Sequence, residues 1–202
     1  MKVSNNDVLC HIVGLNPVTK DNFINKFAAN DRIEMIDLDE ISSKILNSRK
    51  IKEIYSEYDK VKYKKTKKTK DLEKEMTALW VETMKNRLET EVNRYKQKEI
   101  IVIGNNHHPK YTGKKIKIPT ENFYILKSNV CKDVECLIEY NLENYRNQIV
   151  KGTFPIKYLN FNFLKEKKRN LNETYKKKNY EEISMTEFTK SINIYLNKVI
   201  NF

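Results

Sequence analysis

The sequence predicts a three-layer α/β fold, a parallel sheet of four or five strands with helices on both faces. Two observations lead to this prediction. Short apolar runs alternate with segments whose apolar residues recur at three- and four-residue steps, and the first strand–helix–strand order is complete within about 40 residues. This order is typical of parallel sheets, because a parallel neighbour can be reached only through a crossover. The length of 202 residues predicts a single domain, residues 1–202.

Four apolar runs are the predicted strands, and we expect them to be parallel neighbours in one sheet. They comprise residues 8–13, 33–38, 99–103 and 122–127. The third run, EIIVI, is almost entirely β-branched, which predicts a central strand buried on both faces.

Amphipathic patterns predict the helices: residues 19–29, a turn or more near 41–46, 71–98, 132–149 and 185–199. The single tryptophan, Trp80, lies on the apolar stripe of the long helix, so we interpret it as a packing residue and not as a base-stacking one. Residues 151–164 show no regular pattern, and a basic segment from Lys165 to Lys178 leads to the last helix.

The chain is strongly basic, with a formal net charge of +12 and a pI of about 9.4. Such a surface attracts phosphate, on nucleotides or on nucleic acid. Lys outnumbers Arg by more than five to one, however, and Asn and Ile are frequent, which is the codon bias of an AT-rich genome such as that of a large DNA virus or some protists. Codon bias and a polyanion-binding face therefore both remain possible origins of the charge.

Several classes of protein do not fit this composition. No run of about 18 apolar residues exists, so we predict no membrane span. The apolar stretch near the start is too short and too polar for a signal peptide. Three cysteines are too few for a disulfide scaffold, which indicates a reducing, cytoplasmic environment, or a virion if the protein is viral. Neither a zinc site nor a Ser/His/Asp or Cys/His nucleophile arrangement is indicated.

Residues 60–70, KVKYKKTKKTK, contain seven lysines and no acidic residue. Like charges repel and this run cannot bury a face, so we predict an exposed connection. It is either a solvated loop or a contact for a phosphate backbone.

The turn after the first strand has part of a phosphate-binding pattern. Gly14 and Lys20 have the spacing of G-x-x-x-x-G-K-[S/T] between a strand and a helix. In that motif backbone N–H groups cradle phosphate and the Lys adds a charge. Thr19 replaces the second Gly, and Asp21 replaces the hydroxyl residue. An ordinary βα turn is the alternative interpretation.

Carboxylates and amides follow the next two strands. Asp37 and Asp39 form a D-x-D at the end of the second strand, where α/β proteins bind ligands. They could act as metal ligand, general base or hydroxyl acceptor, or as a helix cap. The third strand ends in Gly104-Asn105-Asn106, followed by His107 and His108.

Together these motifs resemble the P-loop small-molecule kinases of the shikimate and gluconate kinase type. The resemblance covers about 130 residues and the order of elements. It implies an ATP and Mg²⁺ site in which Gly14, Thr19, Lys20 and Asp21 hold the nucleotide, Lys20 contacts the transferred phosphate, and Asp37 holds Mg²⁺.

The same resemblance implies the remaining roles. Asp39 would contact a substrate hydroxyl, and the turn of Gly104, Asn105, Asn106 and His107 would face the substrate. Arg146, with Lys151 nearby, would be the cation of a mobile lid.

Two functions from different classes follow. The first is phosphoryl transfer from ATP to a nucleoside, a nucleotide or another hydroxyl acceptor. The second is a catalytically degenerate P-loop scaffold that acts as a structural or nucleic-acid-associated protein through its Lys-rich segments. The missing glycines favour the second, and the retained Gly14–Lys20 spacing with D-x-D favours the first.

Overall fold

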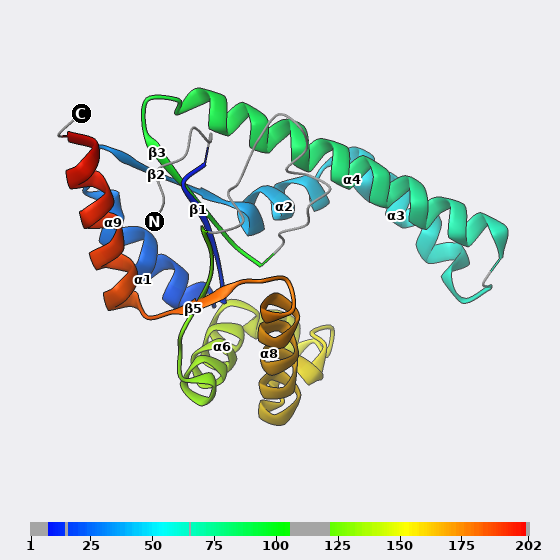
Figure 1. The fold of residues 1–202 in the computed structure, drawn as a ribbon. Coiled ribbons are helices and arrows are strands. Elements are labelled where there is room, and N and C mark those ends of the chain that lie inside the picture. Colours follow the sequence, from blue (N-terminus) through cyan, green and yellow to red (C-terminus); the bar gives the residue numbers. More distant parts are fainter. Residues whose placement is uncertain (1–7, 15, 65, 106–121, 201–202) are drawn as a thin grey trace.

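The computed structural model describes residues 8–14, 16–64, 66–105 and 122–200, and within them it has one five-stranded sheet (Figure 1). The strands are all parallel in the order β2-β3-β1-β4-β5, which confirms the predicted α/β fold. Four strands lie at the predicted segments, and β5 is an additional edge strand. The strands are β1 (Cys10–Val13), β2 (Ile33–Asp37), β3 (Glu99–Ile103), β4 (Phe123–Leu126) and β5 (Glu181–Ile183).

One face of the sheet is covered by α1 (Pro17–Ala28) and α9 (Met185–Ile200), which lie side by side in Figure 1. The register pairs Cys10 with Ile101 and Ile12 with Ile103, so these side chains share this face. They pack against an aromatic cluster contributed by both helices, Phe23, Phe27 and Phe188.

The opposite face is divided between two groups of helices. Over β2 and β3 lie α2 (Leu38–Leu46) and one half of α4 (Lys67–Arg94), whose Ile41, Met84 and Leu88 pack on Ile100 and Val102. The helix between them, α3 (Arg49–Val61), packs against α4. Over β4 and β1 lies α8 (Phe161–Lys176), whose Tyr175 packs with Val13 and Ile125. Helices on both faces complete the three layers.

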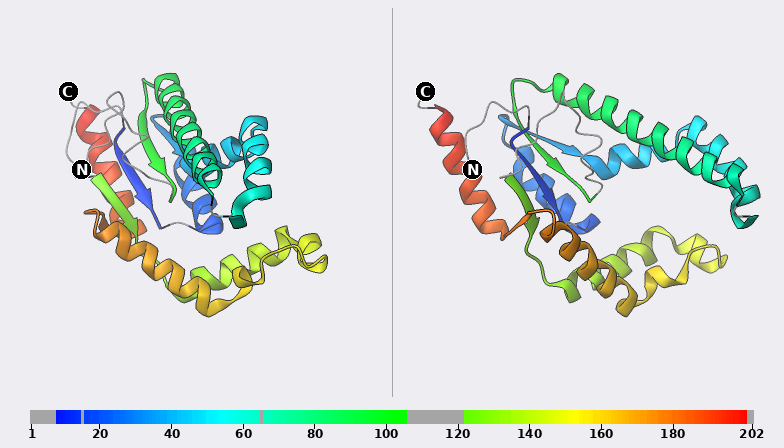
Figure 2. Two further views of the ribbon diagram at one scale, coloured as in Figure 1. Left: turned by 90° about the vertical axis from the view of Figure 1, so that its right-hand side faces the viewer. Right: turned by 45° about the vertical axis from the view of Figure 1, so that its right-hand side comes forward.

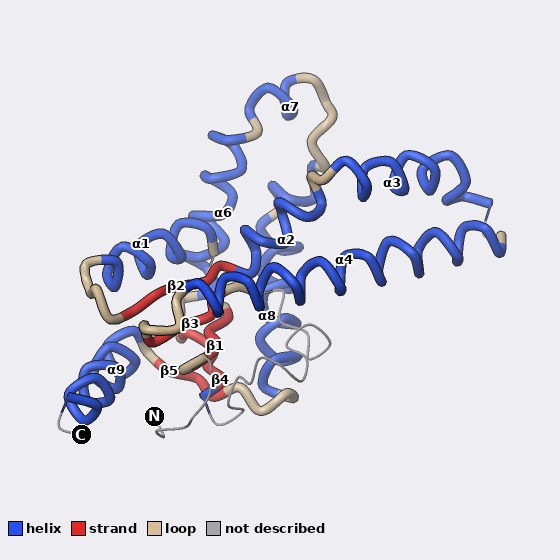
Figure 3. The backbone as a smooth tube through the Cα atoms, turned by 90° about the horizontal axis from the view of Figure 1, so that it is seen from above, coloured by secondary structure: helices blue, strands red, loops and turns tan. Residues whose placement is uncertain are grey.

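Two helical arms extend beyond the sheet (Figures 2 and 3). One is the hairpin of α3 and α4, joined through the 3₁₀ turn η1 (Lys62–Lys64). The other comprises α6 (Val130–Asn144), α7 (Arg146–Val150), η3 (Ile156–Leu159) and α8. Among the described helices, none is long and apolar enough to cross a membrane.

The structure differs from the sequence prediction at several helix boundaries, and two of these boundaries are set by a polar capping residue. The long helix begins at Lys67 instead of residue 71, because Thr66 caps it and pairs reciprocally with Thr69. Residues 165–178, predicted as a basic segment before the last helix, mostly belong to α8, which Asn160 caps. The predicted helix 132–149 is two helices, α6 and α7, separated at Tyr145.

Phe188 provides a test of the core on the α1–α9 face. Its side chain is 0% exposed, and its ring centroid lies 5.5 Å from that of Phe23 and 5.8 Å from that of Phe27. We expect Phe188→Ala to lower the free energy of unfolding by about 3–5 kcal/mol in urea denaturation. Ile194→Ala on the same helix, where the side chain is 47% exposed, is the matched control, with an expected change within about 0.5 kcal/mol. Equal losses would place Phe188 outside the core.

Tyr195 gives α9 an alkaline sensitivity. Burial, together with the neighbouring Glu99 carboxylate 3.3 Å from its hydroxyl, raises the pKa of Tyr195 to about 12. The unfolded chain loses this proton near pH 10, so the folded state binds more protons between about pH 10 and 12 and stability falls there as the pH rises. We expect Tyr195→Phe to lose less stability than the wild type between about pH 9 and 11 in urea titrations. The exposed Tyr63→Phe should behave like the wild type, and an identical loss in all three proteins would contradict the assignment.

Candidate functional site

The carboxyl ends of β1, β2 and β3 meet at one edge of the sheet, which is where open α/β sheets bind ligands. The structure brings six of the predicted site residues together there. These six residues are Gly14, Lys20, Asp37, Asp39, Gly104 and Asn105. Each is joined to another by a hydrogen bond or an ion pair, or is in van der Waals contact with it.

The turn after β1 is short and capped. Asn16 is the N-cap of α1, and Pro17 is already its first residue, so Lys20 lies inside the helix. The Asn16 side chain accepts a hydrogen bond from the Thr19 N–H at 2.8 Å, and Thr19 Oγ1 accepts one from the Asn16 N–H at 3.0 Å. This is a reciprocal capping box.

Two further backbone donors of this turn that a phosphate cradle would use have partners within the protein. The Lys20 N–H donates to the Asn16 carbonyl at 2.8 Å, and the Gly14 N–H donates to Asn105 Oδ1 at 3.0 Å. Pro17 has no N–H to offer. Thr19 thus acts as a capping partner in this arrangement, and Asp21 lies exposed on α1.

Lys20 and Asp37 form an ion pair at the crevice, with 2.6 Å between Nζ and Oδ2. Their side chains are 18% and 11% exposed. Partial burial would by itself lower the pKa of Lys20, but the hydrogen bond to Asp37 and the charges of Asp37, Asp39 and Asp21 outweigh it and raise that pKa. Lys20 is therefore a fixed cation held by its carboxylate partner.

Both carboxylates of the D-x-D have backbone partners. Asp37 Oδ1 accepts from the N–H groups of Asp39 and Glu40 at 2.8 and 3.3 Å, which makes Asp37 the N-cap of α2. The carboxylate of Asp39 accepts from the Asn105 N–H at 3.0 and 3.2 Å. The two aspartates thus join the ends of β2 and β3.

His11 was not predicted as a site residue, yet it lies buried beneath the crevice. Its Nε2 donates to the Gly104 carbonyl at 3.1 Å, which leaves Nδ1 as the acceptor for the Tyr180 hydroxyl at 2.7 Å. The imidazole therefore joins β1 to the turn after β3 and to the residue before β5. An apolar strand containing one His gave no sequence signal of these partners.

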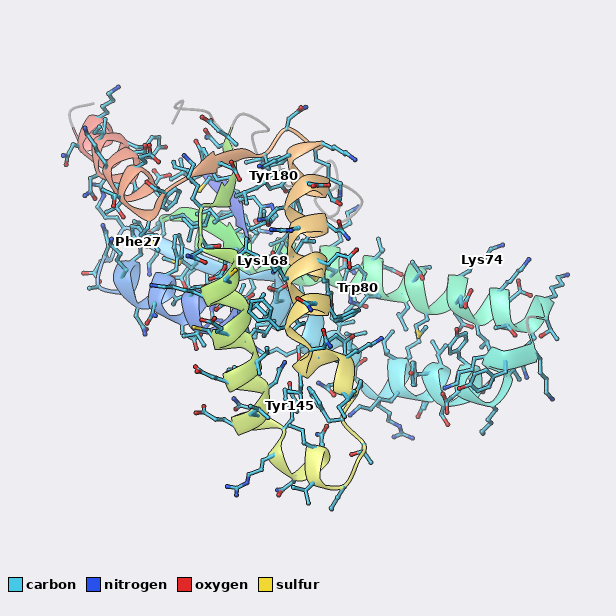
Figure 4. All side chains as sticks on the ribbon, turned by 90° about the horizontal axis from the view of Figure 1, so that it is seen from below. Phe27, Lys74, Trp80, Tyr145, Lys168 and Tyr180 are labelled. Carbon is cyan, nitrogen blue, oxygen red and sulfur yellow. The ribbon has the colours of Figure 1, made fainter. Side chains whose placement is uncertain are left out.

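Lys168 is a second residue that the sequence did not indicate. Its Nζ donates to the Gly14 carbonyl at 3.0 Å and pairs with the Asp133 carboxylate. Asp133 also accepts from Asn16 Nδ2 at 3.1 Å, so it joins α6 and α8 to the capped turn. Figure 4 shows Lys168 close to the sheet and Tyr145 at the outer end of this arm. The proposed lid cation, Arg146, follows Tyr145, is exposed, and is not brought to the six crevice residues.

A cavity of about 520 Å³ lies between this edge and the α6–α8 arm. Its floor includes Gly14, Asn16 and Asn105, and its walls carry aromatic side chains of the arm. Asn106 and His107, predicted to face a substrate, lie outside the described residues. Within the described part of the chain, no three His, Cys, Asp or Glu side chains are grouped to hold a metal ion.

No family model matches the chain, and searches of curated proteins and of solved structures find no significant match. The fold and the geometry of this edge are thus the basis for any inference about function. They define an all-parallel α/β protein compatible with a P-loop-like fold.

Gly104 tests the packing of the crevice. Its φ is +117°, and a Cβ there would lie 3.0 Å from Cγ and 3.1 Å from the backbone nitrogen of Asp39. We expect Gly104→Ala to lower the free energy of unfolding by about 2–4 kcal/mol, measured in urea. Gly152→Ala is the control, because its φ is +67° and nothing lies within 4 Å, so the expected cost is about 1 kcal/mol. Similar costs would show that Asp39 can move aside.

Proposed function

We propose that this chain is a catalytically degenerate P-loop kinase-like protein that acts as a nucleic-acid-associated scaffold and not as a phosphotransferase. One observation carries the proposal: the start of α1 is capped by the side chains of Asn16 and Thr19, which take up backbone donors that a phosphate would need. The all-parallel sheet and the D-x-D at the end of β2 support the kinase-like part of it.

A phosphate-binding turn works by presenting several unpaired N–H groups to the anion. Here residues 17–19, which such a motif needs as part of an open loop, already belong to the first turn of α1. The N–H groups of Gly14, Asn16, Thr19 and Lys20 all donate within the protein. Opening the turn for ATP would require unwinding this capped helix start, which removes the stabilisation that the cap supplies.

The residues expected to hold Mg²⁺ also do not fit that role in this arrangement. One carboxylate oxygen of Asp37 forms the ion pair with the Lys20 ammonium, and the other oxygen accepts the capping hydrogen bonds at the start of α2. Asp39 is engaged by the Asn105 N–H. A divalent ion prefers carboxylate oxygens that are directed at it without a competing cation, so we assign no metal to this edge.

The association with nucleic acid is proposed from the charge of the chain. The formal net charge of +12 favours association with polyanions. The lysines of residues 60–70 lie at the end of a helical arm, and those of α8 lie along the other arm. Lys makes point contacts with phosphate and lacks the fork with which Arg reads bases, so the expected binding is independent of sequence.

Phosphoryl transfer is the second candidate, and the Lys20–Asp37 pair is the observation that favours it. A Lys and two Asp side chains at the carboxyl edge have the composition of a kinase site. For this function Lys20 would have to exchange Asp37 for phosphate.

Titration calorimetry with Mg²⁺·ATP separates the two candidates. We expect no binding heat for the wild type at millimolar nucleotide. We also expect Lys20→Ala to lower the free energy of unfolding by about 1.5–3 kcal/mol, because it removes a hydrogen-bonded ion-pair partner of a largely buried carboxylate.

Lys26→Ala is the matched control on the same helix, since this side chain is exposed and has no ion pair with the described residues. Its expected effect on stability is within about 0.5 kcal/mol. Binding of Mg²⁺·ATP by the wild type that Lys20→Ala abolishes, with stability unchanged, would overturn the scaffold proposal in favour of the kinase.

A further inference from the structure

We propose that the tip of the α3–α4 hairpin, comprising the described residues 60–64 and 66–70, is a binding surface for single-stranded nucleic acid, which it contacts through lysines and the ring of Tyr63. This inference rests on the proposed function for the nature of the partner. It adds the surface and the form of nucleic acid that is bound. The name hairpin tip is used below for residues 60–64 and 66–70.

The hairpin tip lies away from the sheet. The α4 helix has 28 residues, about 42 Å, and its residues Met84, Leu88 and Val92 are the ones that pack in the core of the sheet. The half of α4 nearer the tip extends with α3 beyond the sheet, as Figures 1 and 3 show. Figure 4 labels Lys74, on this half of α4, one turn past the tip. A partner can therefore reach the tip without contacting the crevice.

The charge of the tip is largely uncompensated. Lys62 pairs with Asp59 at 2.5 Å. Within the described part of the tip, the other lysines are exposed and have no ion pair: Lys60, Lys64, Lys67, Lys68 and Lys70. Closely spaced cations repel one another, and this repulsion is relieved when a polyanion binds.

Tyr63 is placed among these lysines and does not pack into the fold. It is 86% exposed, and Lys62 Nζ lies 5.0 Å from the centroid of its ring. A large exposed ring between cations is the combination that binds single strands, because every unpaired base offers a face for stacking while the cations follow the backbone. In a duplex the bases are stacked on each other, so the ring would have no partner.

The tip is also a built turn and not a loose run of lysines. Thr66 caps α4 and pairs reciprocally with Thr69. Thr69 is 4% exposed, and its hydroxyl donates to the carbonyl of Val61 at the end of α3. Two helices thus hold the backbone of the tip in place, which lowers the backbone entropy lost on binding.

The test is fluorescence anisotropy with a labelled oligothymidylate of about 20 nucleotides, longer than the usual single-strand site, between about 50 and 200 mM salt. The tip variant is Lys64→Gln, Lys67→Gln, Lys68→Gln and Lys70→Gln together. We expect it to bind at least tenfold more weakly at the lowest salt, and the slope of log affinity against log salt to fall by about three. Tyr63→Ala should weaken binding about five- to a hundredfold, and Tyr63→Phe should not.

The control variant removes four exposed lysines from other surfaces, Lys132→Gln, Lys151→Gln, Lys190→Gln and Lys198→Gln, for the same change in net charge. Equal weakening of the tip and control variants would overturn the proposal, as would unchanged binding by Tyr63→Ala or equal affinity for a duplex of the same length. Tighter binding to anionic lipid vesicles than to the oligonucleotide would also overturn it. The calorimetric result with Mg²⁺·ATP is independent of all these outcomes, so failure of the tip proposal and failure of the scaffold proposal can be told apart.

Discussion

The capped turn at Asn16 is the constraint on which the rest of the crevice depends. The Asn16 side chain accepts from the Thr19 N–H and donates to Asp133 at 3.1 Å, so it fixes the start of α1 and the position of α6 together. Asp133 in turn pairs with Lys168 of α8, which donates to the Gly14 carbonyl. Buried polar groups must be partnered, and these residues partner one another in a closed network that has little need of a ligand.

A second network crosses the sheet beneath the first. His11 joins the Gly104 carbonyl to the Tyr180 hydroxyl, and Asn105 accepts from Gly14 while donating to Asp39. The ends of β1, β2 and β3 are thereby held in one arrangement. Rigid positioning of this kind suits a scaffold, because the two helical arms are attached to an edge that does not have to open and close.

The sheet could be predicted from the sequence because its signal is local. Buried strands such as residues 99–103 are continuous apolar runs. The helices α1 and α9, which cover one face of the sheet, each have an apolar stripe. By contrast, β5 has three residues of which two are exposed, so it has no strong apolar pattern. The α3 helix does have an amphipathic pattern, in Ile51, Ile54, Tyr55 and Tyr58, but the prediction did not use it. The two partners of His11 lie 93 and 169 positions away along the chain, and those of Lys168 lie 35 and 154 positions away. Contacts over such separations leave no local pattern in the sequence.

The spacing of Gly14 and Lys20 shows how a retained pattern can have a structural cause. Capped at Asn16, α1 has Lys20 in its first turn, and the Lys20 ammonium lies beside Asp37 at the end of β2. Gly14 has a φ of +90°, and a Cβ there would lie 3.2 Å from the side chain of Ile125, so a glycine is needed for the turn itself. Gly14 and Lys20 therefore each have a structural role that does not depend on phosphate, and the sequence motif alone could not distinguish this role from phosphate binding. The hydrogen-bond partners of the turn favour the structural role.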